Sequence, residues 1–242
     1  LWYNKTAAEF RYQEEAYGSS WSTGNSMNRA RANIGGAGTK TAALVFGGNA
    51  GPEGETESWN GSSWTEVNDL NTAREQIGGA GSSTSALGFA GENPGSGTLT
   101  INESWNGSSW TEVADLNTAR NQVTGIGANN TAALCVSGAP SKDTNELWNG
   151  SSWTEVNDLT TTRNYIGGAG TSTAAIAFGG YDGSNTIDNV ETWNGTSWTE
   201  VADINTKRYT AAGSGISTLA LAFGGLDTAN LANTETWNGT SW

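Results

Sequence analysis

A nine-residue block that returns along the whole chain restricts its fold more than any other feature. The block WNGSSWTEV at residues 59–67 recurs almost unchanged at 105–113, 148–156 and 193–201, and its first six positions return at 237–242. A degenerate copy stands at Gly18-Ser19-Ser20-Trp21. The second tryptophans, at 21, 64, 110, 153, 198 and 242, are 43 to 46 residues apart. A period of this length indicates stacked units, each of which is one supersecondary structure.

Spacing within the unit is rigid except in one segment. An arginine always follows the second tryptophan by 10 residues, and a glutamate always precedes the next second tryptophan by 7 residues. The variable segment lies between the glycine that closes the apolar second run, such as Gly48, and that glutamate. The number of residues from the glycine to the glutamate ranges from 8 to 12. We interpret this as a scaffold with one tolerant loop per repeat.

Each unit reads as four short strands. In the first unit, residues 34–38 are small and apolar, and the run 42–46 is apolar and closed by Gly47-Gly48. Residues 56–59 and 62–67 flank Asn60-Gly61, which is a strong hairpin signal. Four strands in a unit of about 44 residues is typical of a propeller blade.

The hairpin predicts a register and a radial position for each strand. A two-residue Asn60-Gly61 loop would set Trp59 opposite Ser62 and Glu57 opposite Trp64, with the indoles as diagonal neighbours on one face. The indoles would fill the wide outer part of a wedge between blades. The glycine- and alanine-rich segments 35–38, 78–81, 167–170 and 211–213 would lie at the crowded axis.

The order of arginine, small first strand, apolar second strand ending in Gly-Gly, Glu-bearing third strand and Trp-bearing fourth strand resembles the kelch repeat, the blade also found in galactose-oxidase-like domains. The resemblance covers about residues 17–242 and implies an all-β, five-bladed propeller with four antiparallel strands per blade. The third copy departs from it with Ser137-Gly138 and one extra residue. We therefore expect a local bulge in that blade.

Counting units also predicts how the ring closes. First-and-second-strand pairs begin after Arg31, Arg74, Arg120, Arg163 and Arg208, which gives five blades. We expect Ser19–Gly24 to supply the outer strand of the last blade, because an unpaired edge would expose backbone donors and acceptors. Residues 1–16 would form a separate N-terminal strand or hairpin (Trp2–Tyr12) leading from an upstream region. A six-bladed ring would need a further chain segment.

The opening Leu1-Trp2-Tyr3-Asn4, followed by Glu-Ser/Thr-Trp-Asn-Gly-Ser/Thr-Ser-Trp-Thr-Glu-Val units, is similar to repeat-bearing virion and tail proteins of marine bacteriophages, notably cyanophages. This resemblance implies a structural protein of the extracellular particle, with other virion proteins or the host surface as partners. A homo-oligomer formed through a region outside this sequence is a further possibility. A bacterial surface protein, lectin-like or glycan-active, is the alternative.

Composition excludes several chemistries. The chain has no histidine, one cysteine, and 24 acidic against 11 basic residues, a net charge of −13. A Ser-His-Asp triad, a thiolate zinc site and an internal disulfide are therefore excluded. The acidic balance argues against nucleic-acid binding, and apolar runs are too short for a membrane span. We expect no cofactor, no metal and no enzyme activity.

The repeated polar residues have a structural and a functional interpretation. The arginines could form an axial anion site, but we favour pairing with the Glu57 or Asp69 series. Carboxylates that recur in every blade argue against a glycosidase site, because one active site requires one blade to differ. The structural repeat set is Arg31, Arg74, Arg120, Arg163, Arg208, Trp59, Trp64, Trp105, Trp110, Trp148, Trp153, Trp193, Trp198, Trp237 and Trp242.

The loops between the second and third strands carry the length variation, so ligand binding is expected there. They share one face of the disc with the connections between blades and are rich in groups that hydrogen-bond sugar hydroxyls. The Asp182 loop lacks the spaced acids of a dedicated calcium site. The Asn-Gly-Ser/Thr turns are expected to be turns rather than glycosylation sites, and Cys135 to be a buried apolar residue. Candidate ligand-binding residues are Glu92, Asn93, Asp143, Tyr181, Asp182, Asn185, Asp227 and Asn230.

Overall fold

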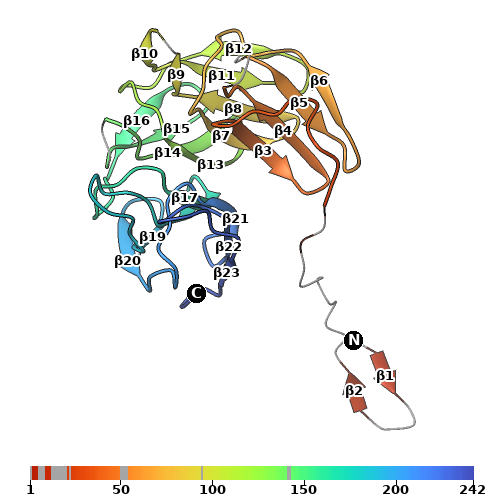
Figure 1. Ribbon diagram of the computed structural model, residues 1–242, viewed down its shortest axis with the longest axis vertical. Coiled ribbons are helices and arrows are strands. Elements are labelled where there is room, and N and C mark those ends of the chain that lie inside the picture. The colour runs from red at the N-terminus through yellow and green to blue at the C-terminus, as the bar shows by residue number, and fades with distance from the viewer. Residues whose placement is uncertain are drawn as a thin grey trace.

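The protein is an all-β propeller with five blades (Figure 1). The computed structural model describes residues 2–4, 9–11, 21, 23–49, 54–93, 95–140 and 143–242, and these form no helix. Blades one to four are four-stranded antiparallel sheets with the strands in chain order, and the fifth has three strands among the described residues. The five-bladed, all-β expectation is therefore confirmed.

The strands run as follows. Blade one contains β3 (Gly35–Thr39), β4 (Ala42–Phe46), β5 (Thr56–Trp59) and β6 (Trp64–Val67); blade two contains β7 (Gly78–Ser82), β8 (Ser85–Phe89), β11 (Asn102–Trp105) and β12 (Trp110–Val113). Blade three contains β13 (Thr124–Asn129), β14 (Ala132–Val136), β15 (Asn145–Trp148) and β16 (Trp153–Val156). Blade four contains β17 (Gly167–Thr171), β18 (Ala174–Phe178), β19 (Val190–Trp193) and β20 (Trp198–Val201), and blade five contains β21 (Ala212–Ile216), β22 (Leu219–Phe223) and β23 (Thr234–Trp237).

The hairpin register differs from the sequence prediction. Trp59 lies opposite Trp64 and Glu57 lies opposite Glu66, so the loop has four residues rather than two. The Asn60 side chain is the reason: its Oδ1 accepts the backbone N–H groups of Ser62 and Ser63 at 3.0 and 2.9 Å. The asparagine thereby closes the turn as an Asx motif, with only Gly61 at positive φ, +94°. The two indoles become direct partners, with ring centroids 5.3 Å apart.

The third blade is bulged, as its extra residue predicts. The pairing of β13 with β14 shifts register between Gly127 and Asn129. A bulge absorbs one residue in one strand without disturbing the rest of the ladder. The second blade has a different addition: β9 (Glu92–Asn93) and β10 (Gly97–Thr98) form a small hairpin inside its loop between second and third strands.

Among the described residues, the hydrophobic core consists of four clusters, each between two successive blades. Between blades one and two, Leu44 and Phe46 of β4 pack against Trp105 and Trp110 of the next blade. The rings of Phe46 and Trp110 meet edge to face at 4.8 Å, and Trp110 Nε1 donates to Thr56 Oγ1 at 3.1 Å. Equivalent clusters lie at the next three interfaces. The indole pair thus fills the wedge between sheets, as expected from its bulk.

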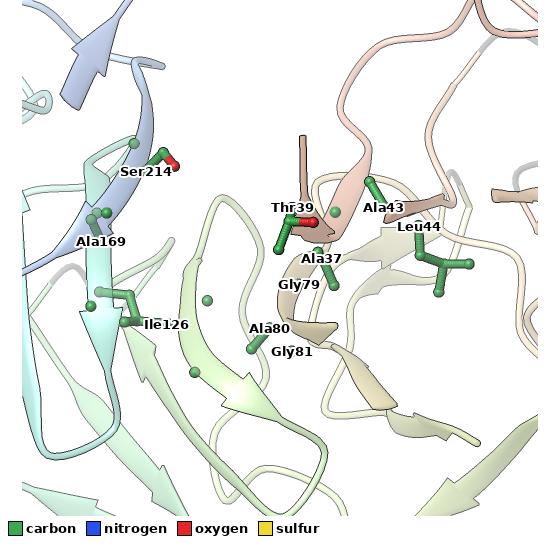
Figure 2. A pocket seen from close by; sticks show the side chains of 18 of the residues that line it. Ala37, Thr39, Ala43, Leu44, Gly79, Ala80, Gly81, Ile126, Ala169 and Ser214 are labelled. Carbon is green, nitrogen blue, oxygen red and sulfur yellow. The ribbon is translucent and has the colours of Figure 1, made fainter. Parts of the chain in front are cut away.

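The first strands converge on the axis, and their glycines permit that convergence. A Cβ atom at Gly125 would lie 2.3 Å from the carbonyl oxygen of Gly79, and one at Gly213 would lie 2.2 Å from that of Gly168. No larger residue fits at such distances. Figure 2 shows the side chains around the axis on the face that includes Thr39 and Ser214, and most of them are small. The predicted glycine-rich hub is confirmed.

The N-terminal part of the propeller departs from the predicted closing strand. Of the segment 19–24, the described residues Trp21, Thr23 and Gly24 belong to no strand, and the others lie outside the described residues. Trp21 does contact blade five: its ring lies 5.1 Å from that of Phe223, and its Nε1 donates to Thr234 Oγ1 at 3.0 Å. Blade five has its own second tryptophan, Trp242, whose ring lies 5.6 Å from that of Trp237. Trp21 therefore contacts the face of blade five and does not extend its outer edge.

A two-stranded sheet precedes the propeller. β1 (Trp2–Asn4) pairs antiparallel with β2 (Glu9–Arg11), with Trp2 opposite Arg11. That residues 1–16 form a separate unit leading from an upstream region stays a prediction. Among the described residues there is no helix long and apolar enough to cross a membrane.

Candidate functional site at the loop-side axial cavity

The propeller has two chemically different faces. The turns between first and second strands and between third and fourth strands share one face, since Trp59 Nε1 donates to the carbonyl oxygen of Lys40 at 3.0 Å. The loops between second and third strands share the other face with the connections between blades, through bridges such as Glu75–Glu92 and Asn164–Tyr181. We call this second face the loop side. A depression of about 430 Å³ opens at the axis on each side.

The repeated arginines do not line either depression. Each is buried and pairs with the glutamate of the third strand in its own blade, and the Asp69 series is not the partner. The glutamate also binds the incoming connection: Glu103 accepts the backbone N–H and the side-chain amide of Asn71. These pairs therefore fix the blade-to-blade crossover. They are Arg31–Glu57, Arg74–Glu103, Arg120–Glu146, Arg163–Glu191 and Arg208–Glu235.

Five side chains, one from each blade, surround the loop-side depression. Each stands two positions after the repeated arginine, where the connection turns into the first strand. Their chemistry differs from blade to blade, although the backbone around them is repeated. They are Asn33, Gln76, Gln122, Tyr165 and Thr210.

All five residues hold a left-handed backbone conformation. Their φ angles lie between +53° and +57°. This region is unfavourable for side chains other than glycine and asparagine, and a β-branched residue such as Thr210 is rarely found in it. Hydrogen bonds across blades hold the turn, from Gln76 N to Asn33 O at 2.9 Å and from Thr210 N to Tyr165 O at 2.8 Å. Strained non-glycine residues clustered at a cavity are a feature of functional sites.

Carboxylates lie directly behind the amide side chains that line one part of the depression. Glu92 accepts the side-chain amides of Gln76, at 2.8 Å, and Asn121, at 2.5 Å. Glu75 accepts the side-chain amide of Asn33 at 2.8 Å. The amide groups are therefore oriented, and the carboxylates act as acceptors rather than proton donors. This side of the depression therefore combines oriented amide groups with negative charge directly behind them.

Tyr165 lines another part of the depression, and two further tyrosines lie behind it. The Tyr209 ring lies 5.9 Å from Tyr165 and 5.8 Å from Tyr181, so the three make a row running outward from the cavity. Burial raises the pKa of Tyr165, and the charge of Glu92 and the nearby Tyr209 raise it further. The Tyr165 hydroxyl consequently stays protonated at neutral pH and can donate a hydrogen bond.

None of the predicted loop residues lines the depression itself. Glu92 lies directly behind it and bonds to the lining Gln76, and Tyr181 lies at the outer end of the tyrosine row. Asn93 instead donates to the Ala73 carbonyl at 3.0 Å, and Asp143 accepts the Thr162 hydroxyl at 3.2 Å. Asp182 accepts the backbone N–H of Asn185 at 2.7 Å and so closes its own loop.

The remaining two predicted residues lie in the blade-five loop. Asp227 lies 3.7 Å from Lys207, and Asn230 pairs with Leu226. Among the described residues, no group of three or more potential metal ligands is present.

The five left-handed residues are not among the ligand-binding residues predicted from the sequence. Binding was predicted where the repeat varies in length, whereas these residues lie in a segment of constant length. A signal was present: the two positions between each repeated arginine and the apolar residue that follows them vary in chemistry from blade to blade. The sequence does not show that the second of these positions faces a cavity.

Cys135 is fully buried in β14, as expected. Burial raises the pKa of its thiol to about 11. A thiol of this kind is mostly protonated at neutral pH and is a poor nucleophile or metal ligand.

Comparison with models of known protein families gave no match, and comparison with curated proteins gave no similar sequence. The function is therefore argued from the geometry of the site.

Proposed function

We propose that this protein is a non-enzymatic, carbohydrate-binding propeller that uses the loop-side axial cavity for attachment. The observation that carries the proposal is the ring of five variable side chains held in a strained backbone conformation at that cavity. A cavity with a few converging polar groups beside aromatic rings is a common form of small-ligand site. Hydroxyl-rich sugars can use both parts, with hydrogen bonds to the amides and carboxylates and apolar contact with the tyrosine rings.

Negative charge beside the cavity restricts which class of sugar can bind there. Glu75 and Glu92 bond directly to the lining side chains of Asn33 and Gln76, and the whole chain has a net charge of −13. An anionic glycan would meet like charge at a partly buried position, which is unfavourable. We therefore propose a neutral sugar, or one carrying an amino group, as the ligand.

We also propose a virion location, which would agree with an attachment role. The basis is the resemblance of the Trp-Asn-Gly repeat to virion and tail proteins of marine bacteriophages. In that setting the loop side would contact a host-surface glycan or a neighbouring virion protein. Labelling purified particles with an antibody against the propeller tests this location, and particles without label would contradict it.

A glycan array followed by calorimetric titration tests the binding proposal. We expect retention of neutral glycans by the wild-type chain, and affinity about tenfold lower in Gln122→Ala and Tyr165→Ala, since each change removes an oriented group from the site. Lys40→Ala, on the opposite face, is the control and should bind like the wild type. Binding that is absent, or equal in all three variants, would contradict the proposal.

A glycan-active protein is the second candidate, favoured by one asymmetry. Of the bridges between connection and loop in the described part of the chain, only that of blade two joins two acids, Glu75 and Glu92. Hydrolysis would consume one water, with one carboxyl protonating the leaving oxygen and the other deprotonating the water. Both carboxylates accept amide hydrogen bonds, which suits binding better than proton donation. Mass spectrometry of a bound glycan after long incubation separates the two, since only an enzyme would shorten it.

A further inference from the structure

The outer face of blade five is apolar and exposed, unlike the same face of every other blade. Leu221 is 37% exposed, whereas its equivalents Leu44, Leu87, Leu134 and Ile176 are fully buried by the following blade. Ile216 and Leu219, paired at the end of the same sheet, are 55% and 65% exposed. Other blades have Thr, Ser or Asn at the first of these positions and Ala or Ser at the second. The added apolar side chains are therefore on the one face that lacks a covering blade.

The opposite end of the arc shows the complementary surface. Trp59 and Trp64 of blade one are only half-buried, while the equivalent pair Trp105 and Trp110 is buried against blade one. Figure 1 shows the sheets following one another from β3–β6 to β21–β23. The exposed face of blade five therefore corresponds to the surface on which an indole pair packs in the other blades. Among the described residues, blade one carries an indole pair that no other blade covers.

Trp21 occupies the position of a sixth blade's second tryptophan. It contacts blade five as Trp110 contacts blade one, with a phenylalanine ring beside it and a threonine hydroxyl accepting its indole N–H. Trp21 itself is 69% exposed.

The segment after Trp21 joins blade one in the same way that one blade joins the next. Asn25 donates to Ser62 O, as Asn68 donates to Ser108 O. Asn28 binds Glu57 through its backbone and side chain, as Asn71 binds Glu103. Trp21 and residues 23–31 are therefore the outer part of a sixth repeat position, located between blades five and one.

We infer that the opening between blades five and one is a docking site for one further Trp-Asn-Gly repeat, folded as a three-stranded sheet, with Trp21 as its outer tryptophan. The four existing interfaces define the partner's chemistry. It carries a glycine-rich inner strand against β3 and β21, an apolar second strand, and a third strand whose tryptophan packs on Leu221.

An extended chain tests this inference. A copy of residues 154–195 added after Trp242 supplies the end of a fourth strand for blade five and then three strands ending in Asn-Gly. We expect a monomer, a rise in Tm of about 5 °C or more, and at least tenfold slower amide exchange in residues 219–223. The control carries the same residues in scrambled order and should match the unmodified chain.

Two substitutions sharpen the test. Gly36 is the counterpart of Gly79 at the open end, and a Cβ there would meet nothing closer than 3.7 Å. Gly36→Ala should therefore be tolerated in the unmodified chain and should lower the Tm of the extended one. Leu221→Lys should change the unmodified chain little and should abolish the gain from the extension.

Four results would overturn the inference. The extended chain could fail to fold, or fold with the added repeat unprotected from exchange. The unmodified monomer could already protect residues 219–223, which would show that its own N-terminal part covers the face. Light scattering could instead show a dimer protected at the same residues, which would make a second copy the occupant.

Discussion

Single residues in this protein do their work through burial. The guanidinium of Arg74 is fully buried with Glu103, and burial lowers its pKa although Glu103 opposes that shift. Arg74 also donates to the carbonyl oxygens of Ala90 and Gly88, at 3.1 and 2.8 Å. A charge removed so completely from water depends on its partner.

Removing one partner of such a pair should be costly. We expect Glu103→Gln to lower the free energy of unfolding by about 3–5 kcal/mol, since it leaves a buried guanidinium uncompensated. Urea denaturation measures this. Lys207→Ala is the control, because the pair of Lys207 with Asp227 is exposed and should contribute less than about 1 kcal/mol. Equal effects would show that the buried pair is not structural.

Cys135 should make stability depend on alkaline pH. Its pKa is raised by burial from 9.0 to about 11, so the unfolded chain releases this proton at lower pH than the folded one. The stabilisation is present below pH 9 and is lost as pH rises through 11, by about 3 kcal/mol at most. Unfolding in urea at pH 8, 9.5 and 11 should show a smaller loss in Cys135→Ala than in the wild type. Parallel pH profiles would contradict this assignment.

At the scale of the element, the first strand of each blade is the most constrained. Its glycines lie against the backbone of the neighbouring blade, while the fourth strand carries its tryptophan at the wide outer end. Each sheet is therefore wedge-shaped because side-chain volume increases from its first strand to its fourth. The register of the outer hairpin follows from a single asparagine side chain in its turn.

Two alanine substitutions in equivalent glycines should differ because their neighbours differ. Gly125→Ala should cost about 1–3 kcal/mol, since its methyl group would lie 2.3 Å from a backbone oxygen of blade two. Gly36→Ala should be neutral or stabilising by up to about 1 kcal/mol, since alanine restricts the unfolded chain. Thermal unfolding of both variants decides the matter. A large loss in Gly36→Ala would show that its strand is covered.

At the scale of the whole molecule, stability comes from four interfaces rather than one core. Each cluster joins only neighbouring blades, as in repeat proteins whose stability is approximately a sum of nearest-neighbour terms. Terminal blades have one such interface and inner blades have two.

This arrangement predicts unequal effects of equivalent truncations. Trp242→Ala removes the ring that packs on Phe178 at 5.1 Å and should loosen blade five alone. Trp153→Ala removes the ring that packs on Phe89 at 5.0 Å, in the middle of the arc, and should raise amide exchange in blades two and three together. Exchange measured by mass spectrometry in both variants checks this. A uniform response across all blades would indicate a single cooperative unit.

The sequence alone determined the blade count, the strand order, the glycine hub and the bulge of blade three, because each follows from a period or from side-chain volume. It left the partner of each repeated arginine open between the Glu57 and Asp69 series, and the folded blade selects the glutamate. It did not determine the hairpin register, which depends on whether Asn60 bonds within its turn. The sequence did not predict the site either, because residues such as Gln122 and Tyr165 are far apart in sequence. They line one cavity only when the five first strands converge. The position of Trp21 was decided by tertiary structure as well, because a tryptophan in a degenerate repeat can be placed only once the face that it contacts has formed.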